Sequence, residues 1–201
     1  PIVVSTRVRL ARNLRGRRFT HHASEADLVA IRREATRRIL ERPSFREGGA
    51  IDLAECLPQE RKYLLERHLA SPDLVREFRQ RGLVLSRDLS RVVMVNEEDH
   101  LRLQVFRSGF DPVTTCADAL GLDTELEETL DFAFADDLGY LTACPTNVGT
   151  GFRISVLAHL PALVLTNEID KILNSLRQLQ FTVRGLYGEG SAVRGAMFQV
   201  S

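Results

Sequence analysis

The sequence predicts an α+β protein in which an antiparallel or mixed β-sheet is flanked by helices. Strand-like runs are separated by helical segments and loops in an irregular order, which argues against a regularly alternating parallel fold. The 201 residues are 44% hydrophobic and 27% charged, as in an ordinary globular protein. A chain of this length can bury a sizeable core without disulfides or metals.

In the first half of the chain, a short strand is followed by helices and then by further strands. Residues 2–4 are β-branched and predict a strand. Ser24 predicts the N-cap of an amphipathic helix over 26–40, because apolar residues recur there every three or four positions. Prolines that can open helices predict helices over 58–68 and 72–79, and two glycines predict a loop at 47–49. Buried or alternating apolar runs predict strands over 83–85, 91–95 and 101–106.

In the second half, helices and strands continue to mix. Residues 112–136 predict helix in two pieces, with a break near Gly121. The alternating run 152–159 predicts a strand. The other elements expected are a strand from 140 to 142, helices that start near Pro161 and Asn167 and run to Leu179, and strands over 181–183 and 196–200.

Composition and charge exclude several classes of partner. Lys plus Arg equals Asp plus Glu, 27 each, so the chain has no net charge to attract nucleic acid or an acidic membrane. No apolar run approaches the roughly 20 residues of a membrane span. The three cysteines are far apart and lack metal-ligand spacing, which predicts free thiols in a reducing, cytoplasmic compartment. Only Lys62 and Lys171 are lysines, and arginine is the better bidentate ligand for phosphate.

Two charged segments interrupt the apolar structure. In an extended segment over residues 5–9, Arg7 and Arg9 project to one side and can face one phosphate, although two exposed arginines on an edge strand are the commoner meaning of this spacing. Residues 96–100 contain three consecutive acids, whose repulsion a metal ion, an arginine cluster or a cationic substrate would relieve. A solvated acidic turn is the simpler alternative for that run.

Two glycine-bearing loops, at 144–151 and 184–191, complete the set of unusual segments. Their glycines allow backbone conformations closed to other residues. The simpler alternatives are a plain connection between strands and a mobile surface loop. No phosphate loop of the GxxxxGK[ST] type, no GxGxxG after a strand and no protein-kinase motif set is present, so a nucleotide would have to be bound in another way.

Together these four segments resemble the catalytic domain of the ATP:guanidino phosphotransferases, the family of creatine and arginine kinases. The matching pieces are STRVRLARNL at 5–14, VNEEDHLRL at 95–103, CPTNVGTGFR at 144–153 and RGLYGEGS at 184–191. The resemblance implies a glutamine synthetase/guanidino kinase-like catalytic domain over residues 1–201. TACPTNVGTG, HLPAL and RGLYGEGS are more similar to the bacterial protein-arginine kinases than to the metabolite kinases, and the C-terminal regulatory domain usual in that branch is not expected within these residues.

The resemblance implies a site for ATP and Mg²⁺. Glu97 matches the acid that reaches the metal through water, and His68 matches a histidine that contacts the nucleotide, although from its position alone it would be a helix-surface residue. The phosphate-binding arginines of the family fall on Arg7, Arg9, Arg102, Arg153 and Arg184. The remaining nucleotide-binding positions fall on Ser5, Thr6, Val8, Ile154, Ser155, Val156, Leu157, Gly185, Leu186, Tyr187 and Gly188.

The family's paired carboxylates fall on Glu98 and Glu189. A guanidinium has a pKa of about 12.5–13.8 and is not nucleophilic at neutral pH. Two carboxylates can grip it, orient one nitrogen toward the γ-phosphorus and accept its proton. Cys144 matches the family's reactive cysteine beside the substrate, with a positioning or tuning role. Because Glu189 lies among glycines, its loop is expected to close over bound ligands.

The function expected from the resemblance is ATP-dependent phosphorylation of arginine side chains in proteins, by direct in-line transfer, within bacterial protein quality control. The implied partners are protein substrates, an activator protein and the Clp protease machinery, with a homodimer in the full-length protein. Two alternatives stay open: a kinase for free arginine or another small guanidino metabolite, and a non-catalytic regulator that binds arginine or phosphoarginine.

Overall fold

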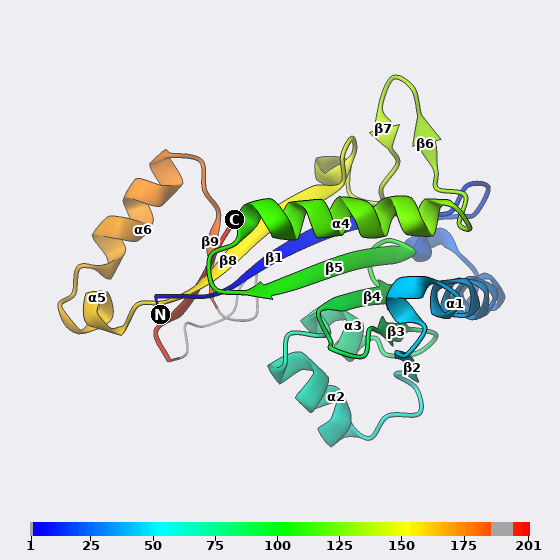
Figure 1. Ribbon diagram of the computed structural model, residues 1–201, viewed down its shortest axis with the longest axis horizontal. Coiled ribbons are helices and arrows are strands. Elements are labelled where there is room, and N and C mark those ends of the chain that lie inside the picture. The colour runs from blue at the N-terminus through cyan, green and yellow to red at the C-terminus, as the bar shows by residue number, and fades with distance from the viewer. Residues whose placement is uncertain (1, 186–194) are drawn as a thin grey trace. The chain divides into compact units, whose positions relative to one another are not determined.

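The structure is a computed structural model that describes residues 2–185 and 195–201 (Figure 1). The chain forms two compact units. The larger unit comprises Arg9–Val105 and Ala117–Phe152, and the smaller unit comprises Pro1–Val8, Phe106–Cys116 and Arg153–Ser201. Strand β1 (Val3–Arg12), strand β5 (Leu101–Ser108) and helix α4 (Pro112–Glu127) each continue from one unit into the other.

The sheet of the larger unit is antiparallel. Its strands β2 (Gly49–Asp52), β3 (Gly82–Leu85), β4 (Arg91–Val95) and β5 pair in that order, with Val84 opposite Val93 and Val93 opposite Leu103. Helix α1 (Glu25–Leu40) packs against β2, β3 and β4, and its Ile31, Ala35 and Ile39 are buried. The other elements of this unit are β6 (Phe134–Ala135), β7 (Gly139–Tyr140), α2 (Pro58–Glu66), α3 (Pro72–Arg76), and the 3-10 turns η1 (Thr20–His22), η2 (Pro43–Phe45) and η3 (Pro145–Asn147).

The smaller unit is built around a second antiparallel set of strands. Strand β10 (Met197–Val200) lies between β8 (Phe152–His159) and β9 (Val183–Arg184). The main chain at the start of β1 is bonded from both sides, because Gly109 N–H donates to the Val4 carbonyl and His159 N–H donates to the Ile2 carbonyl. Helices α5 (Pro161–Leu165) and α6 (Ile169–Gln178) connect β8 to β9.

The predicted fold class is confirmed, since the structure has a mostly antiparallel sheet flanked by helices. The helix predicted over 26–40 is α1, and Ser24 caps it with the expected capping box to Asp27. Along β1, buried Thr6 and Val8 alternate with half-buried Arg7 and Arg9, so the two arginines share one side of a single longer strand. Among the described residues, no helix combines the length and the apolar character needed to cross a bilayer.

Local predictions fail at helix α4, at the strand over 140–142 and at the loop over 47–49. Helix α4 runs unbroken through Gly121, because its Leu122 and Leu126 are buried in the core and outweigh the weak helix propensity of one glycine. It ends at Glu127 instead of 136, since Phe134 pairs with Tyr140 in a hairpin and the predicted strand at 140–142 shrinks to β7. The predicted loop at 47–49 ends in strand β2.

The glycines at the start of β2 explain that last error. A Cβ on Gly48 would lie 2.0 Å from the Leu85 carbonyl oxygen, so glycine lets the chain approach β3 closely. Gly49 then pairs with Leu85. Glycine in a strand marks such close backbone approach as well as loops.

Candidate active site

The acidic segment forms a tight turn between β4 and β5. Asn96 has a φ of 59°, a left-handed conformation that asparagine tolerates well. Its N–H donates to the His100 carbonyl at 2.9 Å, and its side-chain amide donates to the carbonyls of Leu28 and Gln80. The turn is therefore fixed to the body of the larger unit, and the three acids that it carries have defined directions.

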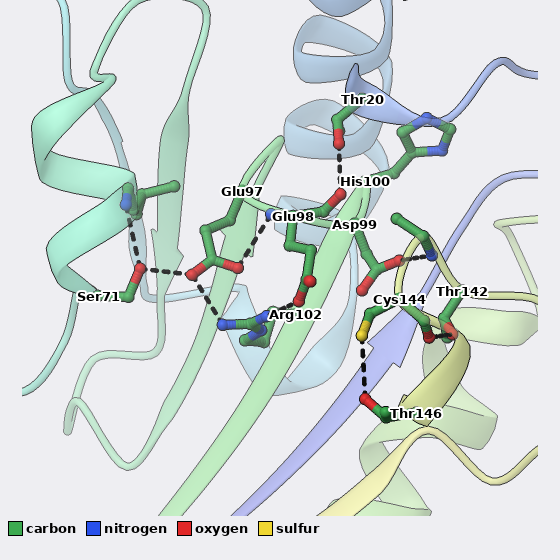
Figure 2. A network of polar contacts seen from close by, with 12 residues as sticks. Thr20, Ser71, Glu97, Glu98, Asp99, His100, Arg102, Thr142, Cys144 and Thr146 are labelled. Atoms are coloured by element: carbon green, nitrogen blue, oxygen red, sulfur yellow. Dashed lines mark hydrogen bonds and ion pairs between the residues drawn. The ribbon is translucent and has the colours of Figure 1, made fainter. Parts of the chain in front are cut away.

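Arg102 joins the first two of these acids (Figure 2). Its Nη1 donates to Oε1 of Glu97 at 2.7 Å and its Nη2 donates to Oε2 of Glu98 at 3.0 Å. The Glu97 side chain is 2% exposed, whereas the Glu98 side chain is 45% exposed. One carboxylate is thus an interior anchor for the arginine, and the other is presented to solvent.

The buried carboxylate is fully engaged. Besides Arg102, Oε1 of Glu97 accepts a hydrogen bond from the Ser71 hydroxyl at 2.5 Å, and Oε2 accepts one from the Glu98 N–H at 3.0 Å. Ser71 is also the N-cap of α3, where its Oγ accepts from the Leu74 N–H. Ser71 follows His68 by three residues, so the predicted nucleotide-contacting turn is tied to the acidic turn.

Both main-chain polar groups of Glu98 are hydrogen-bonded. Its N–H binds the Glu97 carboxylate, and its carbonyl accepts a hydrogen bond from the Thr20 hydroxyl in η1. Burial raises the pKa of the Glu98 carboxyl above its usual value; Arg102 opposes this shift, and the neighbouring Asp99 and Glu97 add to it. A carboxylate with a raised pKa is a better proton acceptor, which suits a general base.

Asp99 and His100, the last two residues of the acidic turn, are buried and structural. Nδ1 of His100 accepts from the Leu14 N–H at 3.0 Å, and its Nε2 lies 2.8 Å from the Arg18 carbonyl, a geometry that requires the neutral ring with the proton on Nε2. Burial lowers the pKa of His100, in agreement with that neutral form. The Asp99 Oδ1 accepts from the Asn13 amide at 2.6 Å and from the Ala143 N–H at 2.7 Å.

The Ala143 contact brings the cysteine loop to the acidic turn (Figure 2). Cys144 follows directly, and it precedes the 3-10 turn η3. Its Sγ lies 2.9 Å from the Thr146 hydroxyl oxygen, and its carbonyl accepts from the Thr142 hydroxyl. Three predicted site residues of the larger unit, Glu97, Glu98 and Arg102, are therefore in direct contact, and Cys144 is connected to them through Asp99.

The smaller unit gathers predicted phosphate-binding arginines around β10. Nη2 of Arg7 donates to Oε1 of Gln199 at 2.8 Å, and Arg153 donates through Nε and Nη2 to the Ser201 hydroxyl at 3.2 and 3.0 Å. Gln199 and Ser201 are two positions apart on an extended segment, so their side chains share a face. The backbone of Arg184 lies opposite Gln199. Two guanidinium groups therefore lie over the same face of this unit.

The other predicted positions divide into four groups. The side chains of Thr6 and Val8 are buried. The Thr6 hydroxyl donates to the Gly109 carbonyl and accepts from the Asp111 N–H, so a nucleotide could be contacted at these positions only by the main chain. That contact stays a prediction. Arg9 lies in the larger unit, on the same side of β1 as Arg7. Leu186, Tyr187, Gly188 and Glu189, with the predicted loop closure, lie outside the described residues. In the smaller unit, Ser5 lies in β1, Gly185 directly follows β9, and four positions lie in β8, namely Ile154, Ser155, Val156 and Leu157.

Sequence reasoning missed the residues that support the site. Ser71, Thr20 and Gln199 each contact a predicted site residue but belong to none of the four conspicuous segments. Ser71 had a usable signal, because a serine directly before Pro72 is typical of an N-cap. Thr20 and Gln199 had none, since their roles depend on contacts with residues far away in the chain.

A family model for the ATP:guanido phosphotransferase C-terminal catalytic domain matches residues 31–201. The chain belongs to this family. This chain is 44% identical to the protein-arginine kinase of Symbiobacterium thermophilum and 46% identical to that of Desulforamulus reducens, in both cases over the whole of this chain. Together with the family model, these relatives confirm the resemblance predicted from the sequence. The chain spans 58% and 57% of the lengths of these two relatives.

Solved guanidino kinases have the same fold. The duplicated taurocyamine kinase from Schistosoma mansoni with bound transition state analog components superimposes with a TM-score of 0.86 and 26% identity, over 98% of this chain and 29% of the other. Lombricine kinase gives a TM-score of 0.77 at 23% identity, over 98% and 58% of the two chains, which shows the fold alone. The guanidino kinase-like fold predicted from the sequence is confirmed.

Proposed function

We propose that this chain is the catalytic domain of an enzyme that transfers the γ-phosphoryl group of ATP to arginine side chains in proteins. The observation that carries the proposal is Glu98, a half-exposed carboxylate with a raised pKa that is fixed beside the cysteine loop and already holds a guanidinium. The printed name of the curated relatives, protein-arginine kinase, supports the same substrate.

The chemistry of the acceptor explains the need for such a carboxylate. A protonated guanidinium must be oriented and must lose a proton before a nitrogen can attack phosphorus. Glu98 contacts Arg102 through Oε2, and its exposed part faces solvent, where a substrate fork can bind. Glu189 would supply the second carboxylate, and Cys144 would help to position the substrate nitrogen.

ATP would be held by the arginines. Phosphoryl transfer depends mainly on positioning and on neutralising charge, for which guanidinium forks are well suited. Arg7, Arg9, Arg102, Arg153 and Arg184 would contact the phosphates. For Arg7 and Arg153, the contacts of both guanidinium groups with one face of the smaller unit, at Gln199 and Ser201, support a shared phosphate-binding role.

Mg²⁺, when bound, would neutralise the charge of the phosphates. The described residues contain no group of three or more His, Cys, Asp or Glu side chains that could hold a metal ion. Both oxygens of Glu97 already accept hydrogen bonds. We expect the nucleotide to hold most of the ion's coordination, with Glu97 reaching the ion through water, as the family resemblance implies.

The cellular setting is part of the same proposal. A cytoplasmic protein-arginine kinase would act in bacterial protein quality control, with an activator protein and the Clp protease machinery as partners. A C-terminal regulatory domain and a homodimer would belong to the whole protein. The alternative substrates are free arginine and other small guanidino compounds, and the alternative class is a binding regulator without activity.

One experiment separates these possibilities. The whole protein is given Mg-ATP with either free arginine or an unfolded arginine-rich protein, and acid-labile phosphate is measured on each. Transfer to the protein alone supports the proposal, transfer to free arginine supports the metabolite kinase, and binding without transfer supports the regulator. Glu98→Gln should lower kcat by about 10²–10⁴-fold while ATP still binds. Unchanged kcat in that variant would contradict the role of Glu98.

A further inference from the structure

Arg12, at the end of β1, is a buried arginine that none of the roles above uses. Its side chain is 2% exposed, and that of its partner Asp123 on α4 is 9% exposed. Arg12 Nε donates to Oδ1 of Asp123 at 2.9 Å, and Nη2 donates to Oδ2 at 2.6 Å. This is a bidentate, fully buried ion pair, the strongest geometry available to the two side chains.

The rest of the guanidinium is also occupied. Nη1 donates to two carbonyls, that of Ala11 at 2.7 Å and that of Thr150 at 2.9 Å. One face of the group lies 3.5 Å from the centre of the Tyr140 ring. Four of its five N–H groups are thus directed at protein acceptors. Arg12 therefore has no fork to offer a phosphate, although it lies in the same STRVRLARNL segment as Arg7 and Arg9.

The Thr150 carbonyl belongs to the loop that begins with Cys144. The next residue, Gly151, accepts a hydrogen bond at its carbonyl from the Ala11 N–H at 2.9 Å. A Cβ on Gly151 would lie 2.8 Å from Arg12 Nη1, so the loop passes as close to the guanidinium as a chain can. The other end of the loop is bound through Ala143 to Asp99. Two buried charged side chains therefore fix the two ends of the segment 144–151.

We propose that Arg12 is a positioning residue that holds the C-terminal end of the Cys144 loop, and that Asp123 and Tyr140 orient it for this task. The inference rests on the proposed function only in saying what the loop is held for, namely to place Cys144 beside the substrate guanidinium. The fork is essential to the role. A lysine at this position could keep the charge opposite Asp123, but a point donor cannot bind the carboxylate and two carbonyls in one plane.

The test uses three variants of the whole protein. Arg12→Lys keeps the charge and removes the fork. Arg12→Met with Asp123→Leu removes both charges, and replacing a buried ion pair by apolar residues usually preserves stability. Arg32→Lys is the matched control, because Arg32 also pairs with a carboxylate in the larger unit, Asp52, but does not contact the loop. Each variant is examined by thermal unfolding, by hydrogen exchange of residues 144–151 without ligand, and by the rate at which a thiol reagent labels Cys144.

Hydrogen exchange in the loop should accelerate about tenfold or more in both Arg12 variants and stay unchanged in Arg32→Lys, with a parallel change in Cys144 labelling. In the transfer assay, kcat should fall by about 10- to 100-fold while the KM for ATP changes little, because a misplaced loop affects the acceptor and not the nucleotide.

Two results would overturn the proposal. One is loop exchange and Cys144 labelling that stay at the wild-type rates in a folded Arg12 variant. The other is full recovery of kcat in the stable double variant, which would make the role of Arg12 merely structural. If the wild-type protein transfers no phosphate at all, the proposed function fails, and the exchange and labelling data still decide whether Arg12 holds the loop.

Discussion

At the scale of single residues, the site depends on differences in burial between neighbours. Glu97 and Glu98 are adjacent in sequence and bind the same arginine, but one is interior and the other is half exposed. The first therefore acts as a fixed counter-charge and the second remains available to a ligand. The sequence predicted both acids through the family motif, but it could not show the hydrogen bonds from Ser71 and Thr20 that hold them.

The raised pKa of Glu98 predicts a pH dependence. Because its pKa is raised, the Glu98 carboxyl takes up its proton at a higher pH than an ordinary glutamate does. Activity that needs the carboxylate should therefore decline as pH falls, with an apparent pKa above that of an ordinary glutamate. The measurement is the pH profile of kcat. The residual activity of Glu98→Gln should lack this acid limb. An apparent pKa in the wild type at or below that of an ordinary glutamate would contradict the assignment.

His100 predicts a second pH effect, on stability instead of activity, because its pKa is lowered and not raised. Its pKa is lowered by burial, so the unfolded chain binds the proton more readily than the folded protein. Its contribution to stability is therefore complete above the unfolded pKa of about 6.5 and is lost as pH falls below it. In His100→Gln, the loss of unfolding free energy between pH 7.5 and pH 5.5 should be smaller than in wild type. An equal loss in the two proteins would refute this assignment.

At the scale of elements, helix and strand positions followed from periodicity and caps, whereas their ends followed from tertiary pairing. The capping box at Ser24 and the proline starts of α2 and α3 were visible in the sequence. The end of α4 was not, because it is decided by the pairing of Phe134 with Tyr140. Local propensity contains no information about a contact between residues that meet only in the folded chain.

Gly121 offers a direct test of that view. It lies within α4, and a Cβ added there would meet no atom within 4 Å. Gly121→Ala should therefore raise the free energy of unfolding by about 0.5–1 kcal/mol, through the lower entropy of the unfolded chain. Chemical denaturation measures the change. Ala119→Gly, at a buried position of the same helix, should act in the opposite direction. A loss of stability in Gly121→Ala would imply that the helix needs the glycine.

The turn between β3 and β4 gives another element-scale prediction. Asp88 accepts hydrogen bonds from the hydroxyls of Ser86 and Ser90, and these lower the pKa of its carboxyl to about 2. This contribution to stability is present above the unfolded pKa of about 3.9 and is lost as pH falls toward 2. Because the side chain is solvent-exposed, Asp88→Asn should cost only about 1 kcal/mol at pH 7, and almost nothing near pH 2. Urea unfolding at both pH values tests the difference.

At the scale of the whole molecule, the four conspicuous segments were enough to predict the fold family, and they carry the chemistry that we propose. They belong to different strands and loops, and the structure brings NEEDH and CPTN together through Asp99, and Arg7 and Arg153 together through β10. What sequence reasoning could not supply was the buried support, such as Arg12 with Asp123, because a buried arginine and a phosphate-binding arginine look alike in a sequence.

Nucleotide binding should be visible in the stability of the whole protein. A ligand that binds only the folded state at 100 times its Kd stabilises it by about 2.7 kcal/mol. Mg-ATP should therefore raise the thermal midpoint by several degrees, and removing Mg²⁺ with a chelator should reverse most of the shift. Arg7→Ala and Arg153→Ala should each weaken the shift. An unchanged midpoint in the presence of millimolar Mg-ATP would contradict nucleotide binding.

The ion pair between Arg102 and Glu98 means that the carboxylate proposed to bind the substrate already binds a guanidinium of the protein itself. An arriving arginine would not fill a vacancy but would displace, or share oxygens with, a tethered competitor of identical chemistry. In the proposed kinase, such an exchange would limit how tightly an acceptor can be retained and would ease its departure after reaction. It would favour rapid turnover over long residence, as release of the proposed protein products requires.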